Sequence, residues 1–307
     1  MNKKYFVIIN VAVSALLLYV LLTQVHLNEI AATVARAQLG LLTLALLISL
    51  LFRIVATPLL WREILVSSGI SADYKDLFLA NAVALPLKFF LPFKISEVTR
   101  AAGLKVLSKN GFPVLLGSTL LLRVVAVAAT LFLFCFGAVL QGKLLMSAFV
   151  LFAVAGFLLV LSKIADHAGT QKGALFSKDL AHCFRKMQGC GFSRILAYSV
   201  LFQAGEVICA YLVFLSMGVS MMAADLLYYV PLMMLVSSIP VSVQGVGVRE
   251  ISALYWFAML PKEIALSFGI LQSMVFHIVP AAVAALLWLC DFMMRTVSGS
   301  LGKEIME

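Results

Sequence analysis

Two short segments of an otherwise apolar sequence each combine a proline, an acidic residue and an arginine. Residues 239–250 read Ile-Pro-Val-Ser-Val-Gln-Gly-Val-Gly-Val-Arg-Glu. Gly245 and Gly247 allow backbone conformations closed to other residues, and a turn at a helix N-terminus presents free N–H groups to an anion. The guanidinium of Arg249 adds forked donors that match a phosphate group. We therefore expect Gly245, Gly247, Arg249 and Glu250 to contribute to an anion-binding site.

Residues 91–100 form the second segment and read Leu-Pro-Phe-Lys-Ile-Ser-Glu-Val-Thr-Arg. This segment supplies Lys94, Glu97 and Arg100 as further candidate binding residues. Glu97 and Glu250 could pair with the neighbouring arginines when the site is empty, or exchange protons. The alternative is that each segment is a helix-breaking turn whose Arg–Glu pair is satisfied internally.

Charged residues inside long apolar segments are the next candidates. Arg123 lies in one such segment, and Glu206 lies beside Gln203 in another. A charge at the bilayer centre is costly unless it is paired or hydrated, so these residues either line a binding path or fix helix packing. Arg53 is close enough to the predicted cytosolic end of its segment to reach the interface. His277 is either a proton relay or a hydrogen-bonded packing residue.

The composition indicates the class of protein that must position these residues. Of the 307 residues, 63% are hydrophobic and only 12% are charged, and the mean hydropathy is +1.08. Several apolar windows reach about 20 residues, which is enough to cross a bilayer. The runs are continuous rather than alternating, which excludes a membrane β-barrel. We predict an all-α polytopic membrane protein.

The apolar segments are not all suited to straight spans. They fall near 5–25, 37–60, 77–92, 112–140, 144–162, 194–217, 224–243, 248–260 and 264–290. Three of them, 77–92, 224–243 and 248–260, are short or interrupted by proline, which removes a helical hydrogen bond. We predict about six full spans and two re-entrant, broken-helix elements, one near 77–92 and one formed by 224–243 with 248–260.

The basic residues indicate the orientation of these spans. Most of them lie in alternate polar segments, and the intervening loops hold only Arg36, Lys143 and Lys262. This bias predicts that both termini are cytosolic, in the inner membrane of a bacterium. It also accounts for the net charge of +9, so nucleic-acid binding is not expected.

This order of elements predicts two inverted halves within one membrane domain, residues 1–143 and 144–307. Inverted repeats whose interrupted helices meet near the midplane are a recurrent plan of transporters. Between the halves, the basic segment 163–193 is predicted to lie against an anionic leaflet. The five cysteines are scattered, and no metal, cofactor or catalytic motif is found, so no enzyme activity is expected.

The two motif segments resemble those of the lysylphosphatidylglycerol synthase transmembrane family of flippase-like membrane proteins. The second, Pro240 through Glu250, is similar to the family pattern of Pro, Gly, Gly, Arg and Glu, whereas Phe93 and Ser96 replace the usual glycines of the first. The resemblance implies a membrane domain that moves aminoacylated phospholipids between leaflets or handles polyprenyl-linked sugars. We expect a stand-alone member, without the aminoacyl-transferase domain of the fused members.

These observations predict a flippase-like transporter for a phospholipid or a polyprenyl-linked lipid, with the headgroup held between the two broken-helix motifs. Two alternatives remain open from the sequence. One is a non-catalytic membrane partner of a cell-envelope lipid or glycan synthase. The other is a membrane-embedded transferase with a polyprenyl-linked donor, for which Glu97 and Glu250 are the candidate carboxylates.

Overall fold

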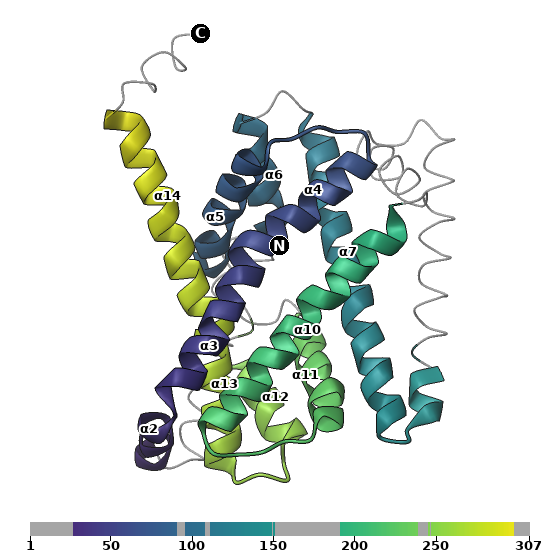
Figure 1. Ribbon diagram of the computed structural model, residues 1–307, viewed down its shortest axis with the longest axis vertical. Coiled ribbons are helices and arrows are strands. Elements are labelled where there is room, and N and C mark those ends of the chain that lie inside the picture. The colour runs from purple at the N-terminus through teal and green to yellow at the C-terminus, as the bar shows by residue number, and fades with distance from the viewer. Residues whose placement is uncertain are drawn as a thin grey trace, which may run out of the picture.

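The computed structural model describes residues 27–90, 96–107, 111–148, 150, 191–238, 245 and 247–297, and within them every regular element is a helix (Figure 1). The principal helices are α2 (Leu27–Arg36), α3 (Leu39–Leu50), α4 (Thr57–Ser67), α5 (Tyr74–Phe90), α6 (Ser96–Leu107), α7 (Phe112–Leu140), α10 (Phe192–Ser216), α11 (Ala223–Ser237), α12 (Val248–Trp256), α13 (Lys262–Ser273) and α14 (Val279–Val297). The predicted all-α fold is confirmed.

Four helical stretches are long and apolar enough to cross a membrane. They are Leu39–Ser67, Phe112–Leu140, Phe192–Ser216 and Lys262–Met294. Each coincides with a segment predicted as a full span. The predicted span 5–25 lies outside the described residues, as does most of 144–162. The chain is therefore a polytopic helical membrane protein.

The two elements predicted to be broken helices are helix pairs, although Pro86 and Pro231 do not interrupt them and lie inside the continuous helices α5 and α11. In the first, α5 packs along α6, and a Cβ added to Gly103 would lie only 3.4 Å from the Cα of Ala80. In the second, α11 packs along α12. The first pair lies toward one end of the molecule and the second toward the other (Figure 1). An inverted repeat requires this placement, although the repeat itself stays a prediction.

Two of the long helices contain a π-helical turn in the middle of the span. The first, η1 (Leu51–Ala56), joins α3 to α4, and the second, η3 (Met274–Ile278), joins α13 to α14. Each ends two residues before a proline, Pro58 or Pro280. A proline cannot donate the next helical hydrogen bond, so a widened turn before it adjusts the backbone. Such turns are frequent at functional sites.

Helices of the two predicted halves interleave. Helix α11 packs along α7, α14 along α5, and α3 along α10. At the α7–α11 crossing, a Cβ on Gly137 would overlap the backbone of Leu227. Small residues at such crossings let helix backbones approach closely in membranes. The positions of α5 and α11 are thus set by spans from the opposite half.

An aromatic cluster holds α12 and α13 against α10. The ring of Phe214 on α10 stacks on Phe268 of α13, with centroids 4.0 Å apart, and lies 5.0 Å from that of Phe257. All three side chains are fully buried. Burying aromatic rings supplies large apolar areas and a defined geometry. This cluster fixes the helix that carries Arg249 and Glu250.

Candidate functional site

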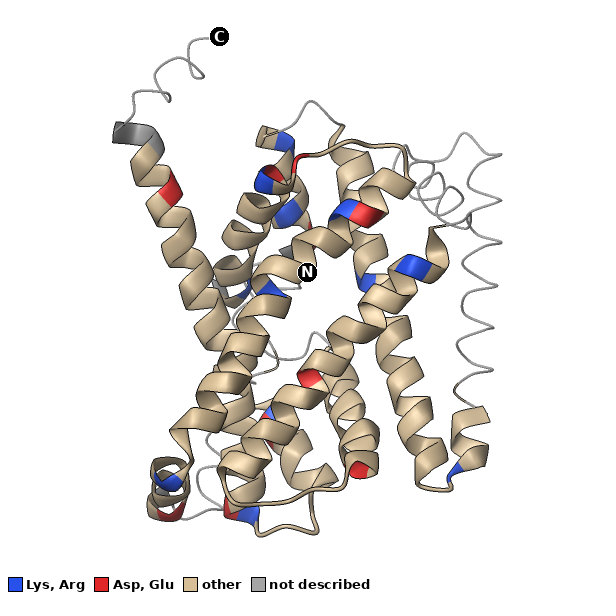
Figure 2. Cartoon of the chain, viewed as in Figure 1, with Lys and Arg blue, Asp and Glu red and all other residues tan. Residues whose placement is uncertain are grey.

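Charged residues are concentrated toward the two ends of the molecule, and a smaller group lies between them (Figure 2). Electrostatic interactions link the members of the inner group into one network. Its members are Arg53, Lys88, Arg100, Arg123, Arg249, Glu97, Glu206 and Glu250. Five basic side chains thus lie with three acidic ones in the described part of the chain.

The first helix pair contributes an ion pair within α6. Arg100 Nη1 lies 3.0 Å from Glu97 Oε2, one helical turn away, and both residues are buried. The hydroxyl of Thr119 on α7 donates to the Glu97 carbonyl at 3.2 Å, which fixes α6 against α7. The internal pairing considered from the sequence is present. Lys94 lies outside the described residues.

The second helix pair uses its glycines for the turn that precedes α12. Gly245 and Gly247 have φ angles of 80° and 83°, in the left-handed region that favours glycine. The amide of Gly247 donates to Glu250 Oε2 at 2.7 Å, so Glu250 caps its own helix. This amide was expected to face an anion, and in the structure it is used internally.

Arg249 and Glu250 are connected through a hydroxyl from another helix. Arg249 Nη1 donates to Ser273 Oγ at 2.9 Å, and Ser273 Oγ donates to Glu250 Oε1 at 2.9 Å. All three residues are about 95% buried. A Cβ on Gly245 would lie 3.3 Å from Arg249 Nη2, so this glycine leaves room for the guanidinium. Ser273 ends α13, immediately before the η3 turn.

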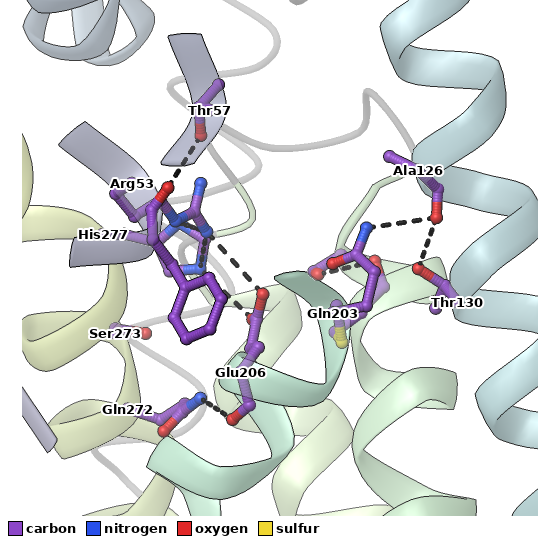
Figure 3. Close-up of polar contacts among 12 residues, drawn as sticks. Arg53, Thr57, Ala126, Thr130, Gln203, Glu206, Gln272, Ser273 and His277 are labelled. Carbon is purple, nitrogen blue, oxygen red and sulfur yellow. Dashed lines mark hydrogen bonds and ion pairs between the residues drawn. The ribbon is translucent and has the colours of Figure 1, made fainter. Parts of the chain in front are cut away.

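The two π turns meet at a third charged group (Figure 3). Arg53 Nη2, from η1, lies 3.7 Å from Glu206 Oε2 on α10 and 3.2 Å from His277 Nδ1 on η3. His277 Nε2 lies 3.8 Å from Glu206 Oε1. The Arg53 guanidinium also stands over the Phe276 ring, 4.3 Å from its centroid. The extension of Arg53 to the interface is therefore wrong, because its side chain points inward and is only 16% exposed.

Two buried amides support the backbone around this group. A π turn displaces carbonyls from the usual ladder, and Asn81 of α5 donates to the Arg53 carbonyl at 3.0 Å. Gln272 of α13 donates to the Glu206 carbonyl at 3.4 Å. Within the described ranges, Asn81 Oδ1, Gln272 Oε1 and Arg53 Nε are buried and have no hydrogen-bond partner. Three unsatisfied polar atoms thus surround one ion pair.

Gln203 and Arg123 lie on the α7 side of α10. Gln203 Nε2 donates to the Ala126 carbonyl at 3.1 Å, and Thr130 Oγ1 donates to the same oxygen at 2.9 Å, away from Glu206 (Figure 3). Arg123 is half-buried one turn earlier on α7. Its charge acts on Glu206, and no hydrogen bond or ion pair joins it to any described residue. A half-buried cation without a partner is suited to an anionic ligand.

Sequence reasoning gave too little weight to Arg53 and missed Asn81 and Ser273. One available signal was a proline inside a long apolar segment, preceded by a basic or polar side chain. Pro58 follows Arg53 in this way, and Pro280 follows His277. Among the described residues, no group of three or more His, Cys, Asp or Glu could hold a metal ion.

The fold and the buried charges define a multi-pass helical membrane protein with a polar centre. Residues 7–293 match the family described as the lysylphosphatidylglycerol synthase TM region, and the chain belongs to this family. The resemblance inferred from the two motifs is thereby confirmed. A search of curated proteins finds no match.

Proposed function

We propose that this protein moves a lipid with a phosphate-bearing headgroup between leaflets, the lipid being a phospholipid or a polyprenyl-linked phosphate. The headgroup occupies the space between the two helix pairs. Arg100, Arg123 and Arg249 bind it, and Lys94, which lies outside the described residues, is a further candidate. The other residues that line the path are Glu97, Glu206, Gly245, Gly247 and Glu250. In this proposal the protein lies in a bacterial inner membrane, with both termini cytosolic.

One observation carries the proposal, namely that Arg123 is a half-buried cation with no hydrogen bond or ion pair to any described residue, within a group of five basic and three acidic side chains. Removing a charge from water costs several kcal/mol unless it is compensated. Glu97 and Glu206 form ion pairs with Arg100 and Arg53, and a phosphate group can compensate the charge of Arg123. An anionic ligand is therefore the chemistry that this polar centre fits best.

The arrangement of α6 favours a lipid over a soluble anion. Glu97 and Arg100 are buried on one face, while Val98 is 40% exposed and Val106 is 85% exposed on another. A lipid has the same division, since its charged headgroup avoids hydrocarbon and its acyl chains avoid water. The headgroup can lie on the buried face while the chains stay outside.

The state of the carboxylates favours transport over group transfer. Glu97 is paired with Arg100, Glu206 with Arg53, and Glu250 with both a serine hydroxyl and a backbone amide. A catalytic base must reach the proton that it removes, within hydrogen-bond distance. Carboxylates engaged in this way serve better to hold the arginines in position.

Reconstitution with a fluorescent lipid tests the proposal. The full chain is placed in liposomes with a trace of headgroup-intact, acyl-labelled phosphatidylglycerol, and leaflet exchange is followed by quenching of the outer label. We expect exchange above that of empty liposomes and at least a tenfold loss in Arg249→Ala, because one charge-assisted contact is removed. The matched control is Arg194→Ala, which breaks a 3.8 Å surface pair with Glu63.

Three outcomes of these experiments would contradict the proposal or its assigned site. If the wild-type protein does not accelerate exchange of this lipid or of a labelled polyprenyl phosphate, the transport function is wrong. Equal rates for Arg249→Ala and Arg194→Ala would remove the assigned headgroup site. Co-purification of a synthase whose activity depends on this chain would instead support the partner alternative.

A further inference from the structure

Glu206 lies at the contact between α10 and the two π turns. Its Oε2 is 3.7 Å from Arg53 Nη2, and its Oε1 is 3.8 Å from His277 Nε2. The side chain is only 7% exposed. One carboxylate therefore connects helical segments from three different spans, and its two oxygens contact different partners.

The surroundings of this carboxylate are incompletely satisfied. Asn81 and Gln272 are 1% and 0% exposed, and each uses its NH2 group on a backbone carbonyl. Their oxygens, together with Arg53 Nε, are buried and have no hydrogen-bond partner among the described residues. Native proteins rarely leave such atoms unpaired, so this location accommodates water or an exchangeable ion. The adjacent guanidinium disfavours a metal cation and leaves a proton as the suitable ion.

Apart from the contact between Glu206 and His277 themselves, the charged groups of the described residues that act on them from neighbouring elements are all cationic. They are Arg53 on η1, Lys88 on α5, Arg123 on α7 and Arg249 on α12. The other titratable side chain in this network on α10 itself is Cys209, whose sulfur donates to the Ala45 carbonyl at 3.3 Å. Glu97 and Glu250 are held by Arg100 and by Ser273. In the described part of the chain His277 faces only cations besides Glu206, and cations disfavour a positive charge on the imidazole, so we assign the exchangeable proton to Glu206.

We propose that Glu206 is a proton-binding site whose occupancy is coupled to the lipid headgroup. This inference rests on the proposed function and adds the coupling ion to it. A headgroup phosphate beside Arg123 and Arg249 offsets part of the positive charge that stabilises the Glu206 carboxylate, and so it favours protonation. By thermodynamic reciprocity, protonation of Glu206 strengthens binding of the phosphate.

The same proton changes the contacts between the spans. Protonation of a Glu206 oxygen removes its negative charge and ends the ion pair with Arg53, while the new hydroxyl can donate to a ring nitrogen of His277. The contact that ties η1 to α10 and η3 is thereby weakened. Widened turns beside Pro58 and Pro280 are places where the long helices can bend. The proton therefore loosens the interior contact, and a bound lipid favours the binding of that proton.

Binding measurements at several pH values test this coupling. The probe is acyl-labelled phosphatidylglycerol added to the purified full chain in detergent, since its phosphodiester keeps one negative charge from mildly basic to mildly acidic pH. We expect its affinity to rise by roughly fivefold or more as the pH falls, in the usual range of coupling between sites. Glu206→Gln imitates the protonated side chain, so its affinity should stay high at every pH. Glu63→Gln, which removes a carboxylate at the surface pair with Arg194, should behave as wild type.

A transport measurement separates this inference from the proposed function. In liposomes, an imposed proton gradient should change the rate of lipid exchange in the wild type and leave Glu206→Gln unaffected. If binding does not change with pH and exchange does not change with the proton gradient, the coupling is wrong, while the proposed lipid transport stands. The absence of any binding and exchange would overturn both.

A second variant covers a failure of Glu206→Gln to fold, which thermal unfolding in detergent would reveal. Glu206→Asp keeps a titratable carboxyl group, but the side chain is one methylene shorter, so the carboxyl group lies farther from Arg53 and His277. We expect the pH dependence of lipid binding to persist with a shifted midpoint. An unchanged midpoint would place the proton on another group and contradict the assignment.

Discussion

Arg53 and Glu206 come from different predicted halves of the chain and form an ion pair in the interior, with 3.7 Å between Nη2 and Oε2. Each is also in contact with His277, so one arginine, one carboxylate and one imidazole join three spans. The two π turns make this possible, because they carry Arg53 and His277 at the places where the helices depart from regular geometry. Four sets of substitutions, two at buried polar contacts and two at glycines, test this arrangement.

Removing Arg53 alone should destabilise the protein more than removing it together with its partner. Arg53→Ala removes the ion-pair partner of the buried Glu206 carboxylate and leaves only Arg123 and Arg249 to offset its charge. Breaking a buried pair in this way typically costs about 3–5 kcal/mol. In Arg53→Ala/Glu206→Ala the carboxylate is gone as well, and part of the loss should be recovered. Thermal unfolding in detergent measures both. Arg194→Ala at the exposed pair with Glu63 should cost less than about 1 kcal/mol.

Gly247→Ala should strain the turn that precedes α12. The φ angle of Gly247 is 83°, where a Cβ costs about 1–2 kcal/mol, and the strain should disturb the amide that binds Glu250. We expect a lower unfolding temperature and slower lipid exchange. Gly40→Ala is the control, because Gly40 is helical and a Cβ there would meet nothing within 4 Å. Equal behaviour of the two variants would show that the left-handed turn is unimportant.

Gly137→Ala should separate α7 from α11. The added Cβ would overlap the Leu227 backbone, which cannot rotate away as a side chain could, and overpacking of this kind costs about 1–3 kcal/mol. The hydrogen bond between Gln141 and Asp225, now 2.8 Å long, should lengthen or break. Gly111→Ala is the control, since its Cβ would meet only Pro113 at 3.9 Å. Unfolding of the two purified variants under identical conditions checks this prediction.

Ser273→Ala should disconnect Arg249 from Glu250 without removing either charge. Two buried hydrogen bonds are lost, at about 1–3 kcal/mol each, and the guanidinium loses its contact with the Ser273 hydroxyl. The rate of lipid exchange should fall by more than the loss of folded protein accounts for. Ser252→Ala is the matched control, because that hydroxyl bonds only to the Val248 carbonyl of its own helix. A similar decline in both variants would mean that the Ser273 link is only structural.

The four described spans were predictable because each rests on local composition. A continuous apolar run of sufficient length must cross the bilayer as a helix, whatever the other segments do. Phe112–Leu140 has the same bounds in the structure as in the sequence-based prediction, and the helix pair around Pro240 also follows from its proline and glycines. Gly245 and Gly247 adopt the left-handed conformation that the choice of glycine suggests.

The contacts within the polar centre were much less predictable. The sequence placed Arg53 near an interface, whereas the structure turns its side chain inward to Glu206 and His277. Nothing in the sequence indicates that Ser273 lies between Arg249 and Glu250, since a serine in an apolar helix usually bonds to its own backbone. The direction of a side chain around a helix axis is set by the neighbouring helices, and the two π turns changed that direction.

The sequence by itself determined a membrane-embedded helical protein with two charged, interrupted elements, because hydropathy, proline and glycine act on the backbone locally. Only the tertiary structure decided which charges meet, namely Arg100 with Glu97, Arg249 with Ser273 and Arg53 with Glu206. The physical reason is that a buried charge must be compensated by whatever group packing brings within a few ångströms. Which group pairs with each buried charge therefore depends on contacts between residues far apart in the chain.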